Sequence, residues 1–424
     1  MIRRVTFFLL MLLGGTGGGG LAAQTVISPP GLAEALATAG AGTTLLLAPG
    51  EYGALVLKDR GGTAGDPLVL RAADPSDPPR LSGLTLSQAR HVVLDGLVLD
   101  YRFTPGDPLH VNPFAILDSL DITLRNSLFD GDVARGLSEE ANGFGYGYGL
   151  GIQRSSGVVI ERSEFRLFHR ALVARASADL VIRANDIHTI RSDGMNFAQV
   201  QGVVIEGNHI HDFQTSAGSN DHADMIQFWT SGTTAPSRNI VIRENVLNSG
   251  GAGWTQSIFM RNELVDQGKA GSDMLYRDIR IEGNVIFNAH LHGISVGETA
   301  GLVIANNTLL QNAASKGSDD NPGLWTPAIS VSPLAIDVTI ARNLVARIAG
   351  PQGQADWRVV DNMLIQNRTR AEGGFYDRLF VAAGSGDPRD LASIAYRADG
   401  PLHGAGLGAP RLDAARPVIE AGRP

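Results

Sequence analysis

The segment Ser219–Thr230 holds the densest group of side chains that could do chemistry. It reads SNDHADMIQFWT and places Asp221, His222 and Asp224 directly before an apolar run. A histidine beside carboxylates can serve as a general acid or base, and carboxylate oxygens are ligands that Ca²⁺ prefers. A polar turn in front of a buried strand would show the same residues. The elements that position this segment must therefore decide between these interpretations.

A short phrase recurs along the chain, with aliphatic residues in alternation, then a charged residue and an Asn. Examples are LVIRANDI, VVIEGNHI, IVIRENVL and IRIEGNVI. Alternation with period two predicts strands, and recurrence along the chain predicts a solenoid with one repeat per coil. Asn side chains at the same turn of every coil can hydrogen-bond along the solenoid axis. The predicted ladder contains Asn185, Asn208, Asn245, Asn284, Asn307 and Asn343, and Ser163 takes the Asn position in a variant of the phrase.

A second strand of each coil aligns behind the first. The aligned segments are RALVA, DGMNF, DMIQF, QSIFM and HGISV, which begin at Arg170, Asp193, Asp224, Gln256 and His292. Their third and fifth residues are nearly all apolar and are expected to enter a core, so the fourth residues should face outward. The alignment stacks Asp193, Asp224, Gln256 and His292 at the strand entrance. The predicted fold is an all-β parallel β-helix in which long loops from neighbouring coils meet along one edge.

The first residues have the pattern of a secretion signal. Two arginines precede the apolar run VTFFLLMLL, and a small-residue segment ends near Ala23. Because so short an apolar run cannot span a bilayer as a helix, we expect residues 1–23 to be removed. The mature protein would then be secreted or periplasmic, with no membrane insertion.

Composition limits the classes of partner. The sequence contains no cysteine, so an exported chain would be held together without disulfides. The net charge of −8 excludes the strongly basic field that nucleic-acid binding requires. The 52 glycines suit a fold with many tight turns between short strands.

From about Gln24 onward, the chain resembles the right-handed parallel β-helix, pectate-lyase-like superfamily of polysaccharide lyases and epimerases. The opening GLAEALATAGAGTTLLLAPGEY and the following GGTAGDPLVLRAA are similar to the N-terminal cap of its polysaccharide lyases. The resemblance implies a single-stranded right-handed parallel β-helix over residues 24–370 with a short capping helix at Gly31–Ala39. Residues 371–424 would form a closing strand and a Gly-rich extension. The chain lacks the lysine and arginine motifs of the chondroitinase and alginate-lyase branch and the Asp-Pro-His-Asp motif of the β-helical mannuronan epimerases.

The resemblance implies a polysaccharide lyase that cleaves an acidic, uronate-containing polysaccharide by β-elimination. Such a reaction needs a base, a cation to stabilise the enolate-like intermediate, and an acid for the leaving oxygen. We predict His222 as base or acid, Tyr148 as acid, and Arg261 or Lys269 as the carboxylate clamp. The full set of predicted residues comprises the catalytic His222, Arg261, Tyr148, His292 and Lys269, the substrate-binding Gln227, Trp229, Trp254 and Asn196, and a Ca²⁺ site of Asp193, Asp221 and Asp224.

Several of these residues also have a structural interpretation. Asp193 and Asp224 fit a turn in which Asp accepts backbone hydrogen bonds. His188 and His211 recur at the repeat spacing and fit a ladder. At the level of function, a C5-epimerase, a glycoside hydrolase with paired aspartates, and a non-catalytic glycan-binding or structural β-helix protein stay open. In each case we expect an acidic polysaccharide as partner and a monomeric protein.

Overall fold

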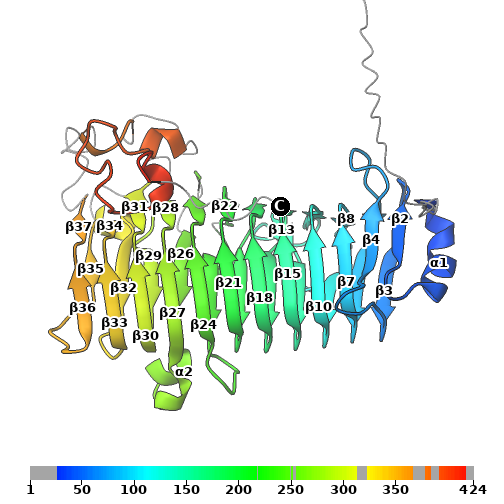
Figure 1. The fold of residues 1–424 in the computed structure, drawn as a ribbon, viewed down its shortest axis with the longest axis horizontal. Helices are drawn as coiled ribbons and strands as arrows, with labels where there is room; N and C mark the ends of the chain where they lie inside the picture. Colours follow the sequence, from blue (N-terminus) through cyan, green and yellow to red (C-terminus); the bar gives the residue numbers. More distant parts are fainter. Residues whose placement is uncertain are drawn as a thin grey trace, which may run out of the picture.

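The described strands wind into a right-handed parallel β-helix with three long sheets, as predicted (Figure 1). The computed structural model describes residues 26–216, 218–248, 250–251, 255–312, 322–365, 378–382 and 391–416. The predicted leader at residues 1–23 lies outside them. Within the described residues, no helix is long and apolar enough to cross a membrane.

Sheet A is formed by the strands that carry the recurring phrase. Its strands, in order along the sheet, are β1 (Val26–Ile27), β2 (Thr44–Leu47), β4 (Leu68–Ala72), β7 (Arg90–Asp95), β10 (Leu120–Arg125), β15 (Ser156–Glu161), β18 (Ala178–Arg183), β21 (Gln201–Glu206), β24 (Arg238–Arg243), β27 (Tyr276–Glu282), β30 (Thr299–Ala305), β33 (Ile336–Ala341) and β36 (Trp357–Val360).

Sheet B follows sheet A in each coil and consists of short strands. They are β5 (Arg80–Leu81), β8 (Val98–Asp100), β11 (Leu128–Asp130), β16 (Glu164–Arg166), β19 (Asp186–His188), β22 (His209–His211), β25 (Val246–Asn248), β28 (Val285–Asn288), β31 (Thr308–Gln311), β34 (Leu344–Val345) and β37 (Met363–Leu364).

Sheet C contains the second set of aligned segments. Its strands are β3 (Ala54–Lys58), β6 (Gly83–Ser87), β9 (Phe114–Leu117), β14 (Tyr148–Gln153), β17 (Arg170–Arg175), β20 (Met195–Ala198), β23 (Ala223–Trp229), β26 (Thr255–Met260), β29 (His292–Val296), β32 (Ala328–Val331) and β35 (Ile348–Ala349). A separate antiparallel pair, β12 (Asp132–Val133) and β13 (Gly145–Tyr146), precedes β14.

The short helices lie at the ends and edges of the solenoid. The predicted capping helix is α1 (Leu32–Thr38), which η1 (Pro29–Gly31) precedes. Helix α1 covers the first coil (Figure 1) and buries Leu32, so the open end of the sheets is shielded. The others are α2 (Glu263–Asp266), η2 (Ser272–Met274), η3 (Pro322–Trp325), η5 (Leu391–Ile394) and η6 (Pro410–Leu412).

One continuous apolar core runs along the axis, as the alternation predicts. In sheet C, the apolar columns pair in register from coil to coil and are buried. They are Leu172, Met195, Ile226, Ile258, Ile294 and Ile329, and Ala174, Phe197, Phe228, Met260, Val296 and Val331. Burial of an aliphatic or aromatic side chain contributes about 1.5–3 kcal/mol, so stacking of the coils is the main source of stability.

The Asn ladder forms at the turn between sheets A and B. Asn245, for example, accepts hydrogen bonds on Oδ1 from the backbone N and the Nδ2 of Asn208, at 3.0 and 2.9 Å. All six predicted members are buried and joined in this way, and the ladder continues to Asn362. Ser163 takes the Asn position in the preceding coil, with its backbone N donating to Asn185 Oδ1.

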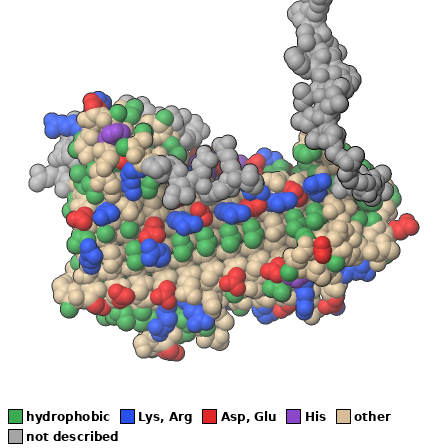
Figure 2. Space-filling view, in the orientation of Figure 1, with side chains coloured by type: hydrophobic (Ala, Val, Ile, Leu, Met, Phe, Trp, Pro, Cys, Tyr) green, Lys and Arg blue, Asp and Glu red, His purple; other side chains and the backbone are tan. Residues whose placement is uncertain are grey.

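The outer face of sheet A carries little that could do chemistry. Val159, Val181, Val204 and Val241 stand at aligned outward positions, between core residues. Figure 2 shows this face with hydrophobic side chains in a row along the sheet and charged side chains beside it. Ion pairs between coils, such as Arg183 with Glu161, account for part of that charge.

The last coils are covered on the sheet B side by the C-terminal segment (Figure 1). Its residues 378–382 and 391–416 contribute a second apolar cluster. In that cluster Phe380, Tyr396 and Leu412 pack against the outward Val285 and Phe287 of β28. The Tyr396 hydroxyl lies 2.7 Å from Thr308 Oγ1 in β31, so the contact includes a buried hydrogen bond.

Candidate functional site

A row of polar side chains crosses the outer face of sheet C where its strands begin. Each member lies two residues before a core residue that pairs in register with the next coil. The row consists of Tyr148, Arg170, Asp193, Asp224, Gln256 and His292. We refer to these six residues as the entrance row. The structure thus places Asp193, Asp224, Gln256 and His292 in the stacked order that the alignment indicates.

In three of the coils, a polar side chain lies three residues after the entrance-row residue and bonds to it, whereas Phe259 takes that position after Gln256. Asn196 Nδ2 donates to Asp193 Oδ2 at 3.0 Å, and Gln227 Nε2 donates to Asp224 Oδ2 at 2.6 Å. Residues three apart on a regular strand face opposite ways, so the strands must be irregular here. In β23 the consecutive Met225 and Ile226 both belong to the core, which shows that irregularity. Asn196 is fully buried and Gln227 is half-buried. Their amides therefore hold the carboxylates of Asp193 and Asp224 in place through hydrogen bonds that are largely shielded from water.

Asp224 holds His222 at the centre of the entrance row. The imidazole Nδ1 lies 3.2 Å from Asp224 Oδ2, and the His222 side chain is 63% exposed while that of Asp224 is fully buried. The hydrogen bond to Asp224 raises the pKa of His222. An exposed imidazole oriented by a buried carboxylate is suited to proton transfer, because the carboxylate fixes the ring and stabilises its protonated form.

Two buried carboxylates stand side by side on adjacent coils. Asp224 donates its backbone N–H to Asp193 Oδ1 at 3.1 Å, and neither side chain is exposed. Burial, together with the negative charge of Asp224, raises the pKa of Asp193 to about 6. Burial also raises the pKa of Asp224. Asp193, His222 and Asp224 bring one ligand atom each within 4.8 Å of one another.

Arg170 supplies the positive charge of the entrance row. Its Nε lies 2.9 Å from Asp193 Oδ2, and its side chain is 24% exposed. The guanidinium also stands over the ring of Tyr148, with 5.9 Å from Cζ to the ring centroid. Tyr148 in turn stacks on His110, at 5.4 Å between centroids. A cation, an exposed imidazole and a phenol are thereby brought to one face.

Sequence reasoning did not select Arg170. The signal was present, because Arg170 opens the aligned segment RALVA in the same column as Asp193. No such signal marks His110, which comes from the loop before β9 and outside the repeat.

Asp221 is separated from the two buried aspartates by its own partners. Its carboxylate lies 2.7 Å from Arg191 Nη2 and accepts from Ser219 Oγ at 2.8 Å. Hydrogen bonds from His169 and Ser219, with the charge of Arg191, hold the pKa of Asp221 well below its usual range. The structure therefore places Asp221 as an anchor of the loop that presents His222, while Asp193 and Asp224 face each other.

His292 lies two coils beyond Asp224 in the entrance row. Its Nδ1 is 2.7 Å from Ser295 Oγ, and its ring stands edge-on to Phe259 and stacks on His290. Burial lowers the pKa of His292. Two strand spacings amount to roughly 10 Å, so His292 could contact a polymer bound at His222 one or two sugars away.

Three of the remaining predicted residues lie apart from this group. Arg261 follows the last residue of β26, five residues after Gln256, which is roughly 17 Å along a strand. There it pairs with Asp266 of α2 at 2.7 Å, and Lys269 is exposed just beyond that helix. Trp229 ends β23 at the same far edge. The structure does not bring these three to His222, and Trp254 lies outside the described residues.

Comparisons with known proteins support the assignment of the chain as a right-handed β-helix. Residues 116–351, more than half of the chain, match the family described as the right-handed β-helix region. Curated protein sequences give no match. Among solved structures, the Dettilon tailspike protein is similar at 14% identity, with 82% of this chain and 67% of that chain covered and a TM-score of 0.52. PfbA, a surface adhesin of Streptococcus pneumoniae, is similar at 12% identity, with 80% and 90% covered and a TM-score of 0.51.

The periplasmic alginate epimerase AlgG is also similar, at 11% identity, with 80% of this chain and 84% of that chain covered and a TM-score of 0.47. At these identities the solved structures bear on the fold alone. The matched family region contains every described member of the entrance row and the longest stretch of the Asn ladder. The chain therefore belongs to the right-handed β-helix family.

Proposed function

We propose that the protein is a carbohydrate-active enzyme that cleaves a uronate-containing polysaccharide by β-elimination at the entrance row. The observation that carries this proposal is the exposed His222 imidazole, held by the buried Asp224 and within the field of Arg170. A base next to a cation is what removal of a proton beside a carboxylate requires. As part of the proposal, the enzyme acts outside the cytoplasm, after removal of the leader predicted at residues 1–23.

His222 is the proposed base. In its neutral form, it takes the proton from the sugar carbon that carries the uronate carboxylate. The electron pair of that C–H bond forms a carbon–carbon double bond, and the bond from the neighbouring carbon to the glycosidic oxygen breaks. The imidazolium then gives its proton to the leaving oxygen. Asp224 stabilises that imidazolium, so one residue can serve as base and then as acid.

Arg170 is the proposed carboxylate clamp. During proton removal, negative charge moves onto the uronate carboxylate, and a guanidinium can bind it through two parallel hydrogen bonds. Arg170 is paired with Asp193 in the free protein, but burial raises the pKa of that aspartate to about 6. A carboxylate that is costly to keep charged competes less well for Arg170, so a substrate carboxylate can share the guanidinium.

Tyr148 lies three strand spacings from Asp224, roughly 14 Å along the axis. At that distance it is better placed to contact a neighbouring sugar than the bond being broken. Its contact with Arg170 also orders the clamp. We assign Tyr148 to substrate binding on this geometry.

Ca²⁺ is kept as a proposed cofactor, with a changed set of ligands. Three buried oxygens, on Asn196 Oδ1, Asp224 Oδ1 and Gln256 Oε1, have no hydrogen-bond partner within the described residues, and they come from three consecutive coils. Such acceptors suit a cation or a buried water. Asp193 and Asp224 would hold the ion together with the amide oxygens of Asn196 and Gln256. The ion would neutralise part of the acidic substrate's charge. Asp221 is already paired with Arg191, so we leave it out of the site.

A glycoside hydrolase is disfavoured by the burial of the two aspartates. An acid and a base that flank a glycosidic bond must both reach the substrate, with their carboxyl groups about 5 Å or more apart. Asp193 and Asp224 are unexposed and have oxygens within 4.8 Å of each other. A C5-epimerase shares the proton removal at His222, and the products distinguish it from a lyase.

The test is incubation with a panel of uronate polymers, with and without a chelator, while the ultraviolet absorbance of unsaturated ends is followed. We expect absorbance to appear with at least one polymer, and both His222→Ala and Arg170→Gln to reduce kcat/KM by about 10²-fold or more. The matched control is Arg175→Gln, an exposed arginine at the other end of the same strand, which should keep its activity.

Other outcomes would overturn the proposal. Inversion of the sugar without unsaturated ends would show an epimerase, and binding without either product would show a glycan-binding protein. Full activity in His222→Ala would exclude His222 as the base. A loss of activity in the presence of chelator, restored by Ca²⁺, would support the cation.

A further inference from the structure

We propose a second metal site, for a transition-metal dication such as Zn²⁺, on the outer face of sheet B. Its ligands are Asp186 of β19 and His209 and His211 of β22. This site is separate from the entrance row, and it stands or falls independently of the lyase activity.

The backbone register brings the three side chains together. Asp186 pairs with His209 across adjacent coils, and His188 pairs with His211. His209 and His211 are two residues apart on one strand, so both face outward on the same side. One ligand atom from each of Asp186, His209 and His211 lies within 4.8 Å of the others. The site is thus built on regular strands.

The distances between ligand atoms are close to those of a metal site. With bonds of about 2.0–2.1 Å, the ligand atoms of a tetrahedral Zn²⁺ lie roughly 3.4 Å apart. Asp186 Oδ1 is 2.8 Å from His211 Nε2 and 3.7 Å from His209 Nδ1. These two values stand on either side of the required distance, and the nitrogens of the two imidazoles lie within 4.8 Å of each other. Side-chain rotations that bring the two imidazole nitrogens closer together would place all three atoms around one ion.

His211 also has the outer partner that metal-binding histidines usually have. Its second ring nitrogen, Nδ1, lies 2.8 Å from Asp212 Oδ2. A carboxylate on the far nitrogen fixes the ring and makes the ligating nitrogen more basic. The side chains are accessible as well, since those of His209 and Asp186 are 44% and 51% exposed.

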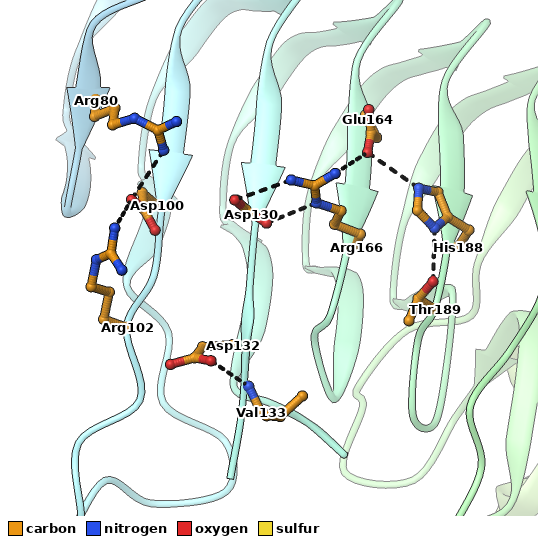
Figure 3. A network of polar contacts seen from close by, with 10 residues as sticks. All are labelled: Arg80, Asp100, Arg102, Asp130, Asp132, Val133, Glu164, Arg166, His188 and Thr189. Atoms are coloured by element: carbon orange, nitrogen blue, oxygen red, sulfur yellow. Dashed lines mark hydrogen bonds and ion pairs between the residues drawn. The ribbon is translucent and has the colours of Figure 1, made fainter. Parts of the chain in front are cut away.

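The neighbouring His188 is excluded because the carboxylate at its Nε2, that of Glu164, is already paired with Arg166. Figure 3 shows its Nε2 bonded to Glu164 and its Nδ1 to Thr189, at 3.2 and 2.8 Å. Glu164 also binds Arg166, which reaches Asp130, so His188 belongs to a chain of charges along sheet B. His188 does stack on His211, as the ladder interpretation predicts. His209 stacks on the same ring from within its own strand, at 4.0 Å between centroids, and it also faces Asp186.

The charge around the three ligand atoms suits a cation. Asp186 and Asp212 bring two carboxylates to His211, each 2.8 Å from one of its ring nitrogens. Arg411 contributes one opposing positive charge. Ligand nitrogens must be deprotonated, so metal binding would displace any proton that the imidazoles carry.

The experiment is calorimetric titration of the full chain with Zn²⁺, repeated in buffers of different ionisation enthalpy to count released protons. We expect one strong site and a release of protons on binding that grows as the pH is lowered, because imidazoles bind a metal only when deprotonated. His209→Ala and His211→Ala should each remove that site, and Asp212→Asn should weaken it by about 10- to 100-fold. Co²⁺ as a spectroscopic probe should give the visible absorption of an ion bound by nitrogen ligands.

His188→Ala is the matched control, because it alters the adjacent histidine of the same surface. It should retain Zn²⁺ binding. The proposal is overturned if Zn²⁺ does not bind, or if it binds equally well to the His209→Ala and His211→Ala proteins. Circular dichroism of each variant establishes that it is folded, and the lyase assay reports on the entrance row separately.

Discussion

Replacement of Asn245 by alanine tests whether the buried Asn ladder holds the coils together. The side chain makes four hydrogen bonds. Oδ1 accepts from the N and Nδ2 of Asn208 at 3.0 and 2.9 Å, and Nδ2 donates to Ile205 O at 2.9 Å and to Asn284 Oδ1 at 3.0 Å. Asn245 is completely buried. In Asn245→Ala, two donors of Asn208 lose their acceptor at a site that water does not reach.

The expected cost follows from these unmade bonds. Each buried donor or acceptor left without a partner costs about 1–3 kcal/mol. Two donors of Asn208 and the carbonyl of Ile205 therefore predict a loss of roughly 3–9 kcal/mol in the free energy of unfolding. That exceeds the 0.5–3 kcal/mol of most single substitutions. The matched control is Asn362→Ala, at the end of the ladder, where four similar bonds are only half-buried. Water can replace those, so about 1 kcal/mol is expected.

Urea unfolding followed by circular dichroism measures both variants. Hydrogen exchange adds a local readout, because the backbone N–H of Asn208 donates to Asn245 Oδ1 and should lose protection in Asn245→Ala. Equal costs for Asn245→Ala and Asn362→Ala would refute the reasoning, since burial would then not decide the strength of the ladder.

Three further predictions concern the site and the C-terminal segment. In Asp224→Asn the pKa of His222 should fall, so the acid limb of a kcat/KM profile moves to lower pH while kcat drops about 10²-fold; an unmoved limb would exclude His222. Because the pKa of Asp193 is raised to about 6, this residue binds more protons between pH 4 and 6 in the folded state than in the unfolded chain. The contribution of Asp193 to the free energy of unfolding therefore falls as the pH rises through this range. Urea unfolding of Asp193→Asn should lack that slope. Tyr396→Phe, which removes the bond to Thr308, should cost about 1 kcal/mol and speed proteolysis of the segment; unchanged proteolysis would contradict this.

The fold could be predicted from the sequence because its signals are local and repeated. The alternation of apolar residues indicates which side chains of a strand face the core, and the recurring Asn marks the same turn in each coil. Both features depend only on residues within a single coil. Stacking then follows, since an isolated coil cannot bury its own apolar face. The register between coils, such as Met195 with Ile226, is set by that same pattern.

The candidate site was predictable in part. The alignment of the strand segments placed Asp193, Asp224 and His292 on one face. The same alignment contains Arg170, but a charged residue at the start of a strand gave no reason to select it. Arg261 was selected on outward parity, which it has. The alternation of inward and outward residues does not indicate at which edge of the sheet a residue lies. Arg261 follows the last residue of β26, so it lies at the edge opposite His222.

The contacts of the loop that carries Asp221 and His222 depend on the tertiary structure. The break in the repeat identifies this loop as an insertion beside Asp224. It could not determine that Asp221 pairs with Arg191 and Ser219 while His222 turns to Asp224. Those partners come from different coils and from the loop itself. Asp221, His222 and Asp224 compete for them, and their positions and charges decide which pairs form. Repetition fixes a solenoid's core through short-range pattern, whereas a single insertion has no repeat to constrain it, so its contacts emerge only when the coils are stacked.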